Sequence, residues 1–176
     1  MEILKIFSTG ILFFLVGCGS NLTPRTAPEN NVTGFKVPAT TVTDINDDAF
    51  VIPVISGKPR VFIFATEFCA TCQAEHRELR DLMAIHGGLL PTNVEIFTIM
   101  VDAVDNVDSL GFKSVTGMQW NPYYQVGDQL KNDLCGEKTV IYPCVVAELP
   151  GQGVVLKKIG AVSSEELQSK TGAWLW

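Results

Sequence analysis

The segment Val61-Phe-Ile-Phe-Ala-Thr-Glu-Phe-Cys-Ala-Thr-Cys72 joins a run of apolar residues to two cysteines three positions apart. The continuous apolar run that ends at Ala65 is typical of a buried strand. Apolar and small residues alternate with charges over about 73–86, which predicts an amphipathic helix that Gly87 and Gly88 end. The two cysteines therefore lie between a buried strand and the start of a helix.

This placement gives the two cysteines different chemistry. Cysteines three residues apart on a first helical turn can meet disulfide geometry, with Cα atoms about 4.4–6.8 Å apart. At a helix N-terminus, free N–H groups and the helix dipole stabilise a thiolate. We predict that Cys69 is the nucleophile, which forms a mixed disulfide with a partner, and that Cys72 resolves it. Two alternatives stay open: a copper or zinc site made by Cys69, Cys72 and His76, and a purely structural disulfide.

The remaining pattern predicts an α/β domain with a mixed sheet. Residues 40–45 and 49–55 flank an Asn-Asp-Asp turn and indicate a β-hairpin. A second buried strand over 93–101 follows the helix, so the two buried strands form a parallel pair with a right-handed crossover. Residues 112–124 are expected to be an irregular insertion, in which the aromatic side chains pack locally. The later elements are a short helix over 126–134, strands over 144–149 and 154–159, and a final helix whose capping box begins at Ser163.

The segment from Val61 to Cys72 resembles the active-site segment of thioredoxin, and Tyr142-Pro143 follows about 70 residues later, as the cis-proline of that family does. The early hairpin and the insertion resemble the membrane-anchored TlpA/ResA group, and the resemblance covers about 40–172. It implies a thioredoxin-like fold, with a central mixed sheet flanked by helices and an N-terminal β-hairpin extension. Cys69 would attack, Cys72 would resolve, Pro143 would pack beside the disulfide and bind substrate backbone, and Tyr142 would tune potential and partner choice.

The same resemblance implies an activity and its partners. It favours a thiol–disulfide oxidoreductase that acts on protein substrates, in the direction of reduction, with apocytochrome c or copper-site proteins as substrates. Electrons would come from a DsbD-like membrane protein, and no cofactor is expected. An oxidase or an isomerase is the nearest alternative. Outside this class, the alternatives are a copper-handling lipoprotein and a non-catalytic scaffold.

Three positions depart from the thioredoxin pattern. Ile63 occupies the place of a buried aspartate, so Glu67 or another carboxylate would have to accept the proton of the resolving cysteine. The dipeptide Ala70-Thr71 differs from that of common relatives, so the direction of electron flow is not carried over. Cys144 directly follows the expected cis-proline; we favour a structural bond with Cys135, nine residues earlier, over exchange with the active-site pair.

The N-terminus indicates export. Residues 1–17 have the layout of a signal peptide, and Leu15-Val16-Gly17-Cys18 resembles the lipobox of bacterial lipoproteins. The resemblance implies acylation of Cys18, a polar tether over 18–34, and a domain over 35–176 in the periplasm or outside the cell. Gly19 favours the outer membrane. Four other cysteines remain, an even number that suits disulfides in an oxidising compartment.

Composition sets outer limits on the function. The 176 residues fit one domain with a real core, and 47% of them are hydrophobic, which excludes a disordered chain. A net charge of −6, from 13 basic and 19 acidic residues, excludes a general nucleic-acid binder, which needs a basic face.

Overall fold

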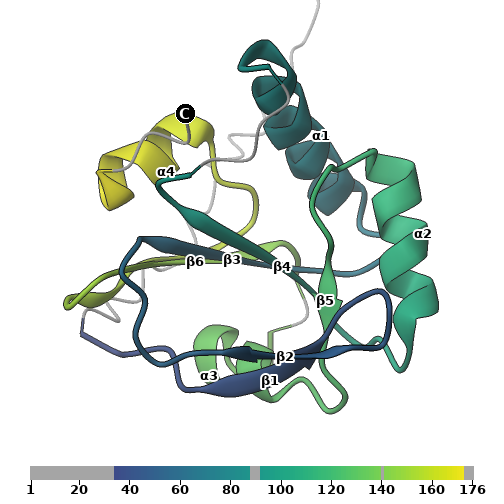
Figure 1. Ribbon diagram of the computed structural model, residues 1–176, viewed down its shortest axis with the longest axis horizontal. Coiled ribbons are helices and arrows are strands. Elements are labelled where there is room, and N and C mark those ends of the chain that lie inside the picture. Colours follow the sequence, from purple (N-terminus) through teal and green to yellow (C-terminus); the bar gives the residue numbers. More distant parts are fainter. Residues whose placement is uncertain (1–33, 88–91, 140, 173–176) are drawn as a thin grey trace, which may run out of the picture.

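The computed structural model describes residues 34–87, 92–139 and 141–172 (Figure 1). The strands are β1 (Thr40–Thr43), β2 (Ala49–Ile52), β3 (Arg60–Ala65), β4 (Glu95–Met100), β5 (Tyr123–Tyr124), β6 (Cys144–Leu149) and β7 (Gly153–Ile159). The helices are α1 (Ala70–Ile85), α2 (Asn106–Thr116), α3 (Gln129–Cys135) and α4 (Ser164–Thr171). The predicted signal peptide, Cys18 and the tether before Gly34 lie outside the described residues. Among the described helices, none has the length and apolar character to cross a membrane.

The strands form one mixed sheet in the order β2-β1-β5-β4-β3-β6-β7. Strands β3, β4 and β5 are parallel, and β6 is antiparallel to β3, with Phe64 opposite Cys144. The segment that follows β3 and the segment that precedes β6 therefore meet at the same edge of the sheet. The α/β class, the β1–β2 hairpin and the parallel pair β3–β4 are as the sequence predicts.

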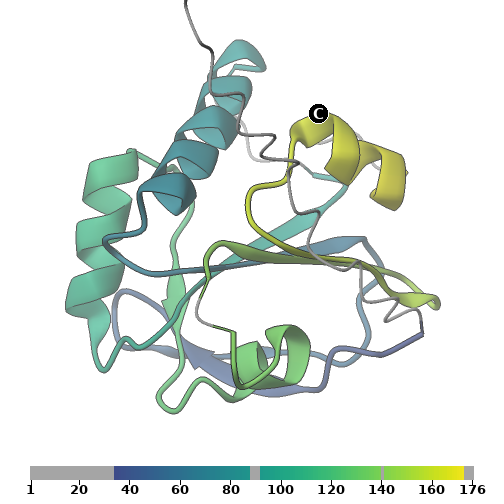
Figure 2. The same ribbon diagram turned by 180° about the vertical axis from the view of Figure 1, so that it is seen from behind.

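Helices cover both faces of the sheet, with α1, α2 and α4 on one side and α3 on the other (Figures 1 and 2). Strand β3 is buried at all six positions, because both faces are covered, and this explains its unbroken apolar run. Its side chains divide between two cores. Val61 and Ile63 pack with Leu79 of α1, whereas Phe62 and Phe64 pack with Leu130 of α3.

The prediction of an irregular insertion over 112–124 is wrong in its first part, because helix α2 extends to Thr116. The Asp105 side chain caps α2 by accepting the Val107 N–H, and Gly117, with φ of 67°, ends it. Gly111 and several β-branched residues obscure the helix in the sequence, since both lower helix propensity. The Glu67 carboxylate lies against Gly111, and a Cβ at this position would require that side chain to move. Helix α1 begins at Ala70, three residues before the predicted start.

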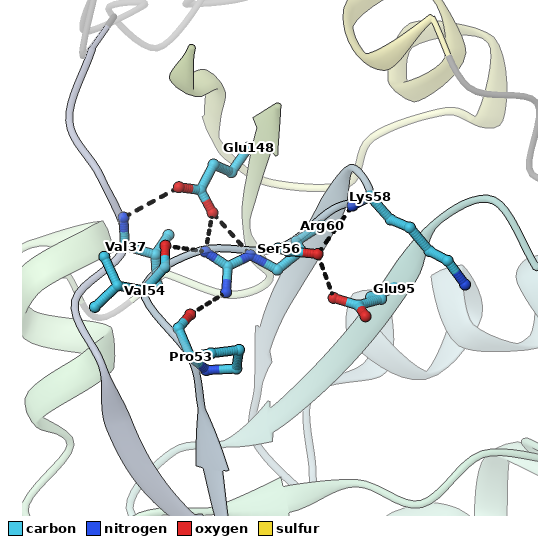
Figure 3. Close-up of polar contacts among 8 residues, drawn as sticks. All are labelled: Val37, Pro53, Val54, Ser56, Lys58, Arg60, Glu95 and Glu148. Atoms are coloured by element: carbon cyan, nitrogen blue, oxygen red, sulfur yellow. Dashed lines mark hydrogen bonds and ion pairs between the residues drawn. The ribbon is translucent and has the colours of Figure 1, made fainter. Parts of the chain in front are cut away.

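A buried ion pair ties the N-terminal extension to the sheet at the end of β3 that lies away from the cysteines (Figure 3). The Arg60 side chain is 1% exposed and pairs with Glu148 of β6, while it also donates to the carbonyl oxygens of Pro53 and Val54. Glu148 in turn accepts the Val37 N–H at 3.3 Å. The guanidinium thus satisfies backbone carbonyls that follow β2 and have no sheet partner.

Candidate active site

Cys69 and Cys72 lie at the N-terminus of α1, directly after the segment that leaves β3. Cys69 is the N-cap residue, and its sulfur accepts the Cys72 N–H at 3.1 Å. A disulfide joins the two residues, with their Cα atoms 5.2 Å apart. Cys69 is partly exposed, whereas Cys72 is fully buried. Of the two cysteines, Cys69 is therefore the one that a partner can approach.

The loop before β6 faces this pair. The Tyr142-Pro143 peptide bond is cis, and the Tyr142 carbonyl oxygen lies 3.5 Å from the Cys69 sulfur. Pro143 is buried, and Tyr142 is partly exposed. The antiparallel pairing of β6 with β3 brings these residues together although 73 positions separate Cys69 from Tyr142. The structure thus places all four residues of the expected exchange site at one edge of the sheet.

The Tyr142 phenol is held neutral. Burial raises the pKa of Tyr142 to about 12, and the nearby carboxylates of Asp102 and Asp128 act in the same direction. The hydroxyl group donates to the Thr139 carbonyl oxygen at 3.2 Å. Tyr142 therefore brings an uncharged ring and a fixed backbone carbonyl to the site at neutral pH.

A second disulfide joins Cys135, the last residue of α3, to Cys144. Cys144 is fully buried in the core that contains Phe64 and Leu130, on the α3 side of the sheet. Cys72 belongs to the core on the opposite side, with Leu79. The sheet lies between the two disulfides, so this arrangement does not place Cys144 for exchange with Cys72.

Sequence reasoning missed one titratable residue of the site, Glu75. This side chain is 6% exposed and lies on the buried face of α1, three residues after Cys72. One carboxylate oxygen accepts the Val162 N–H at 3.0 Å, and the other accepts no hydrogen bond from a described residue. Burial raises the pKa of Glu75 to about 7. The signal was present in the sequence, because Glu75 precedes the apolar Leu79 by four positions and so shares its helix face.

Glu67 is directed elsewhere. Its carboxylate lies against Gly111 of α2, and its backbone carbonyl accepts the Gln73 side-chain amide at 2.8 Å. Ile63, at the place of the thioredoxin aspartate, is buried in the same core as Cys72. Of Glu67 and Glu75, Glu75 is therefore the one that shares the buried helix face of the resolving cysteine.

His76 uses both ring nitrogens within the fold. Nδ1 lies 2.8 Å from the Cys72 carbonyl oxygen, and Nε2 lies 2.9 Å from the Thr98 hydroxyl oxygen. The residue is fully buried, and burial lowers its pKa to about 4, so the ring is neutral. To serve as a metal ligand together with Cys69 and Cys72, His76 would have to break one of these bonds. Across the described residues, no group of three potential ligands is placed to hold a metal ion.

Comparison with known proteins places the fold. No protein-family model matches the chain, and no curated protein matches it. Solved structures do match. The thioredoxin domain of a thiol-disulfide oxidoreductase from Bacteroides vulgatus is 20% identical, with a TM-score of 0.59 over 78% of this chain and 93% of that one. The fold is thioredoxin-like.

Two further structures give the same result. A thiol:disulfide interchange protein of the thioredoxin family from Chlorobium tepidum is 12% identical, with a TM-score of 0.62 over 81% of this chain and 97% of that one. A secreted disulfide oxidoreductase from Mycobacterium tuberculosis, described as homologous to E. coli DsbE, is 20% identical to this chain. Its TM-score is 0.56, over 76% of this chain and 95% of that one. At these identities the likeness establishes the thioredoxin-like fold, which the sequence had led us to expect.

Proposed function

We propose that this protein is a thiol–disulfide oxidoreductase that exchanges disulfides with protein substrates through Cys69 and Cys72. The placement of Cys69 carries the proposal. Its sulfur caps α1, accepts the Cys72 N–H at 3.1 Å and lies 3.5 Å from the Tyr142 carbonyl oxygen, and the residue is partly exposed. A helix N-terminus stabilises the thiolate that attacks, and exposure lets a partner reach it.

Reduction of a substrate proceeds in two displacements. The Cys69 thiolate attacks one sulfur of a substrate disulfide, which forms a Cys69–substrate bond and releases the other substrate sulfur as a thiolate that takes up a proton. The Cys72 thiolate then attacks the Cys69 sulfur, which forms the Cys69–Cys72 bond and releases the second substrate thiolate, and this thiolate is protonated in turn. Two electrons and two protons pass to the substrate, and oxidation is the reverse reaction.

Glu75 supplies the base for the second displacement. Positions three apart on a helix bring Cβ atoms to about 5–6 Å, so the two side chains are neighbours, and we infer that the Glu75 carboxylate takes up the Cys72 proton directly or through one water. A group with a pKa of about 7 exchanges protons readily near neutral pH. The carboxylate that accepts the proton is thus on α1, as Glu75, whereas thioredoxin has an aspartate on the strand that corresponds to β3.

The substrate lies along the loop that ends in Pro143. The Tyr142 carbonyl is fixed beside Cys69, so a substrate segment that forms the mixed disulfide passes this loop and meets its backbone. The Phe68 side chain, 88% exposed, lies next to Cys69 in sequence and offers apolar surface to such a segment. Tyr142 and Pro143 are accordingly assigned to substrate binding.

The protein acts outside the cytoplasm and as a reductase. Its signal peptide, the lipobox before Cys18 and the even number of remaining cysteines support export and acylation, with palmitate among the acyl chains and the domain tethered by 18–34 to a membrane, the outer membrane in preference. Similarity to the TlpA/ResA group supports reduction, with a DsbD-like electron donor and apocytochrome c or copper-site proteins as substrates. The location and the direction of reaction both rest on sequence resemblance.

A pair of matched variants tests the activity. With Cys72→Ser, the mixed disulfide on Cys69 cannot be resolved, so the variant is expected to accumulate covalent, thiol-reversible adducts with a disulfide-containing test protein. With Cys69→Ser, no such adducts form. A scaffold would give no adducts with either variant, and stoichiometric copper binding that requires Cys69, Cys72 and His76 would favour a metal carrier.

A further inference from the structure

Helix α1 holds a fully buried histidine four residues after the resolving cysteine. The His76 ring stacks on Trp120, with centroids 5.8 Å apart, and meets the Phe112 ring edge-on at 4.8 Å. A buried imidazole is costly unless its nitrogens are hydrogen-bonded, and both are. The hydrogen-bond partners are Cys72 of α1 itself and Thr98 of β4, and the ring contacts come from α2 and from the segment before β5.

The directions of these hydrogen bonds follow from what each group can do. The Trp120 indole N–H can only donate, so it donates to the Thr98 hydroxyl oxygen at 2.9 Å. The Cys72 carbonyl can only accept, so His76 carries its proton on Nδ1. In the neutral ring, Nε2 is then an acceptor, and the Thr98 hydroxyl donates to it at 2.9 Å. A continuous series of hydrogen bonds therefore runs from Trp120 through Thr98 and His76 to the Cys72 carbonyl.

This series of hydrogen bonds ends at Cys72, the residue whose N–H contacts the nucleophile Cys69. The carbonyl of Cys72 accepts from His76, and the N–H of the same residue donates to the Cys69 sulfur at 3.1 Å. Thr98 is fully buried in strand β4, between β3 and β5, so this series of hydrogen bonds is anchored in the sheet. The first turn of α1 is thereby fixed to the sheet at the position from which the N–H points to the sulfur.

We propose that His76, held by Thr98 and Trp120, is a positioning residue that keeps the Cys72 N–H directed at the Cys69 sulfur and so stabilises the reduced, thiolate form of Cys69. The proposal rests on the function proposed above. His76 does not touch a substrate and does not exchange a proton with one. His76 affects the equilibrium between the dithiol and the disulfide, because the hydrogen bond from the Cys72 N–H to the Cys69 sulfur is strongest when that sulfur is a thiolate.

Substitutions at Thr98 separate this role from a general effect on packing. Thr98→Val preserves shape but removes the hydroxyl, whereas Thr98→Ser keeps the hydroxyl and removes a methyl group. The readouts are the equilibrium constant for reduction of Cys69–Cys72 by glutathione and the alkylation rate of Cys69. Thr98→Val is expected to lower both by about three- to tenfold, the range of one hydrogen bond, and Thr98→Ser to keep them within about twofold of wild type.

Two further variants complete the test. Trp120→Phe removes the donor to Thr98 and should shift both readouts in the same direction as Thr98→Val, which covers the case in which the valine variant does not fold. Phe112→Leu disturbs the packing of His76 without removing a hydrogen bond, so stability should fall while both readouts stay at wild-type values.

The outcomes are distinct. Wild-type readouts in Thr98→Val, or in Trp120→Phe if the valine variant does not fold, would overturn the proposal, as would equal shifts in Thr98→Val and Thr98→Ser. A wild-type protein whose Cys69–Cys72 pair does not react with glutathione at all would instead contradict the proposed function itself.

Discussion

Cys72 and Glu75 share the buried face of helix α1, three residues apart, and each is almost completely removed from solvent. Burial raises the pKa of the Glu75 carboxyl group to about 7, so this group can hold the proton that the Cys72 thiol gives up. In the proposed mechanism, Glu75 takes the part of the thioredoxin aspartate, whose place on β3 is occupied by Ile63. Proton transfer from Cys72 to Glu75 can be tested by substitution of Glu75 alone.

Glu75→Gln should slow the resolution of mixed disulfides by about 10²-fold, the lower range of general-base effects. The first displacement, by Cys69, should keep its rate, because that sulfur is stabilised by the helix N-terminus. Rapid-quench alkylation with a disulfide substrate measures the two steps separately. Glu78→Gln, on the exposed face of the same helix, serves as the control. Wild-type resolution in Glu75→Gln would remove this residue from the mechanism.

Glu75 and His76 should give opposite pH dependences of stability. The pKa of Glu75 is raised from 4.5 to about 7, so its contribution is present below pH 4.5 and is lost as the pH rises to about 7. The pKa of His76 is lowered from 6.5 to about 4, so its contribution is present above pH 6.5 and is lost as the pH falls to about 4. Between these limits the two effects oppose each other in the wild-type protein.

Single substitutions should expose each effect. Between about pH 4.5 and 6.5, the free energy of unfolding of His76→Phe should fall as pH rises, and that of Glu75→Gln should rise, each by up to about 1.4 kcal/mol per pH unit. Urea unfolding at several pH values gives the slope of the unfolding free energy against pH, and this slope is the quantity to compare between the variants. Parallel slopes in the two variants would show that the burial of these groups is not as described.

The disulfide between Cys135 and Cys144 should be structural. Closure of a nine-residue loop restricts the unfolded chain, so the double variant Cys135→Ala/Cys144→Ala should lose about 2–3 kcal/mol of stability. Cys69 should keep its reactivity, because Cys144 packs on the other side of the sheet. Peptide mapping of the oxidised protein provides an independent check: a peptide that links Cys144 to Cys69 or Cys72 would contradict this assignment.

The buried pair of Arg60 and Glu148 should stabilise the fold without affecting the active site. Arg60→Met leaves a buried carboxylate without its partner and should cost about 3–5 kcal/mol. The double variant Arg60→Met/Glu148→Leu should recover much of that loss, since no charge is left uncompensated. Chemical denaturation measures both effects. A double variant less stable than Arg60→Met, or a loss of Cys69 reactivity in either, would contradict this view of the pair.

The sequence could predict those features that short segments determine. The apolar run of β3, the cysteine spacing and the capping box at Ser163 each depend on a few neighbouring residues, and each lies where it was expected. Helix α2 was obscured by Gly111, against which the Glu67 side chain lies in the folded protein. That contact joins residues far apart in the chain, and no local pattern contains it.

The electrostatics of the site were hidden for the same reason. Glu75 is buried against the segment around Val162, 87 residues later, and His76 meets partners on β4 and beyond α2. The spacing of Glu75 from Leu79 indicates the helix face on which it lies, but its raised pKa and its hydrogen-bond partner come from the assembled core. Periodicity placed His76 on the helix, but the hydrogen bonds that fix its tautomer come from the fold.

A redox titration of residues 19–176 in glutathione and dithiothreitol buffers, with each cysteine followed by alkylation and mass spectrometry, tests most directly whether Cys69 and Cys72 form a redox-active pair. We predict that Cys69 and Cys72 are oxidised and reduced together, with a potential near or below about −270 mV, as expected of a reductase. Cys135 and Cys144 should stay bonded throughout. A potential near about −120 mV would make the protein an oxidant. A Cys69–Cys72 pair that is neither oxidised nor reduced in these buffers would contradict the proposed oxidoreductase function.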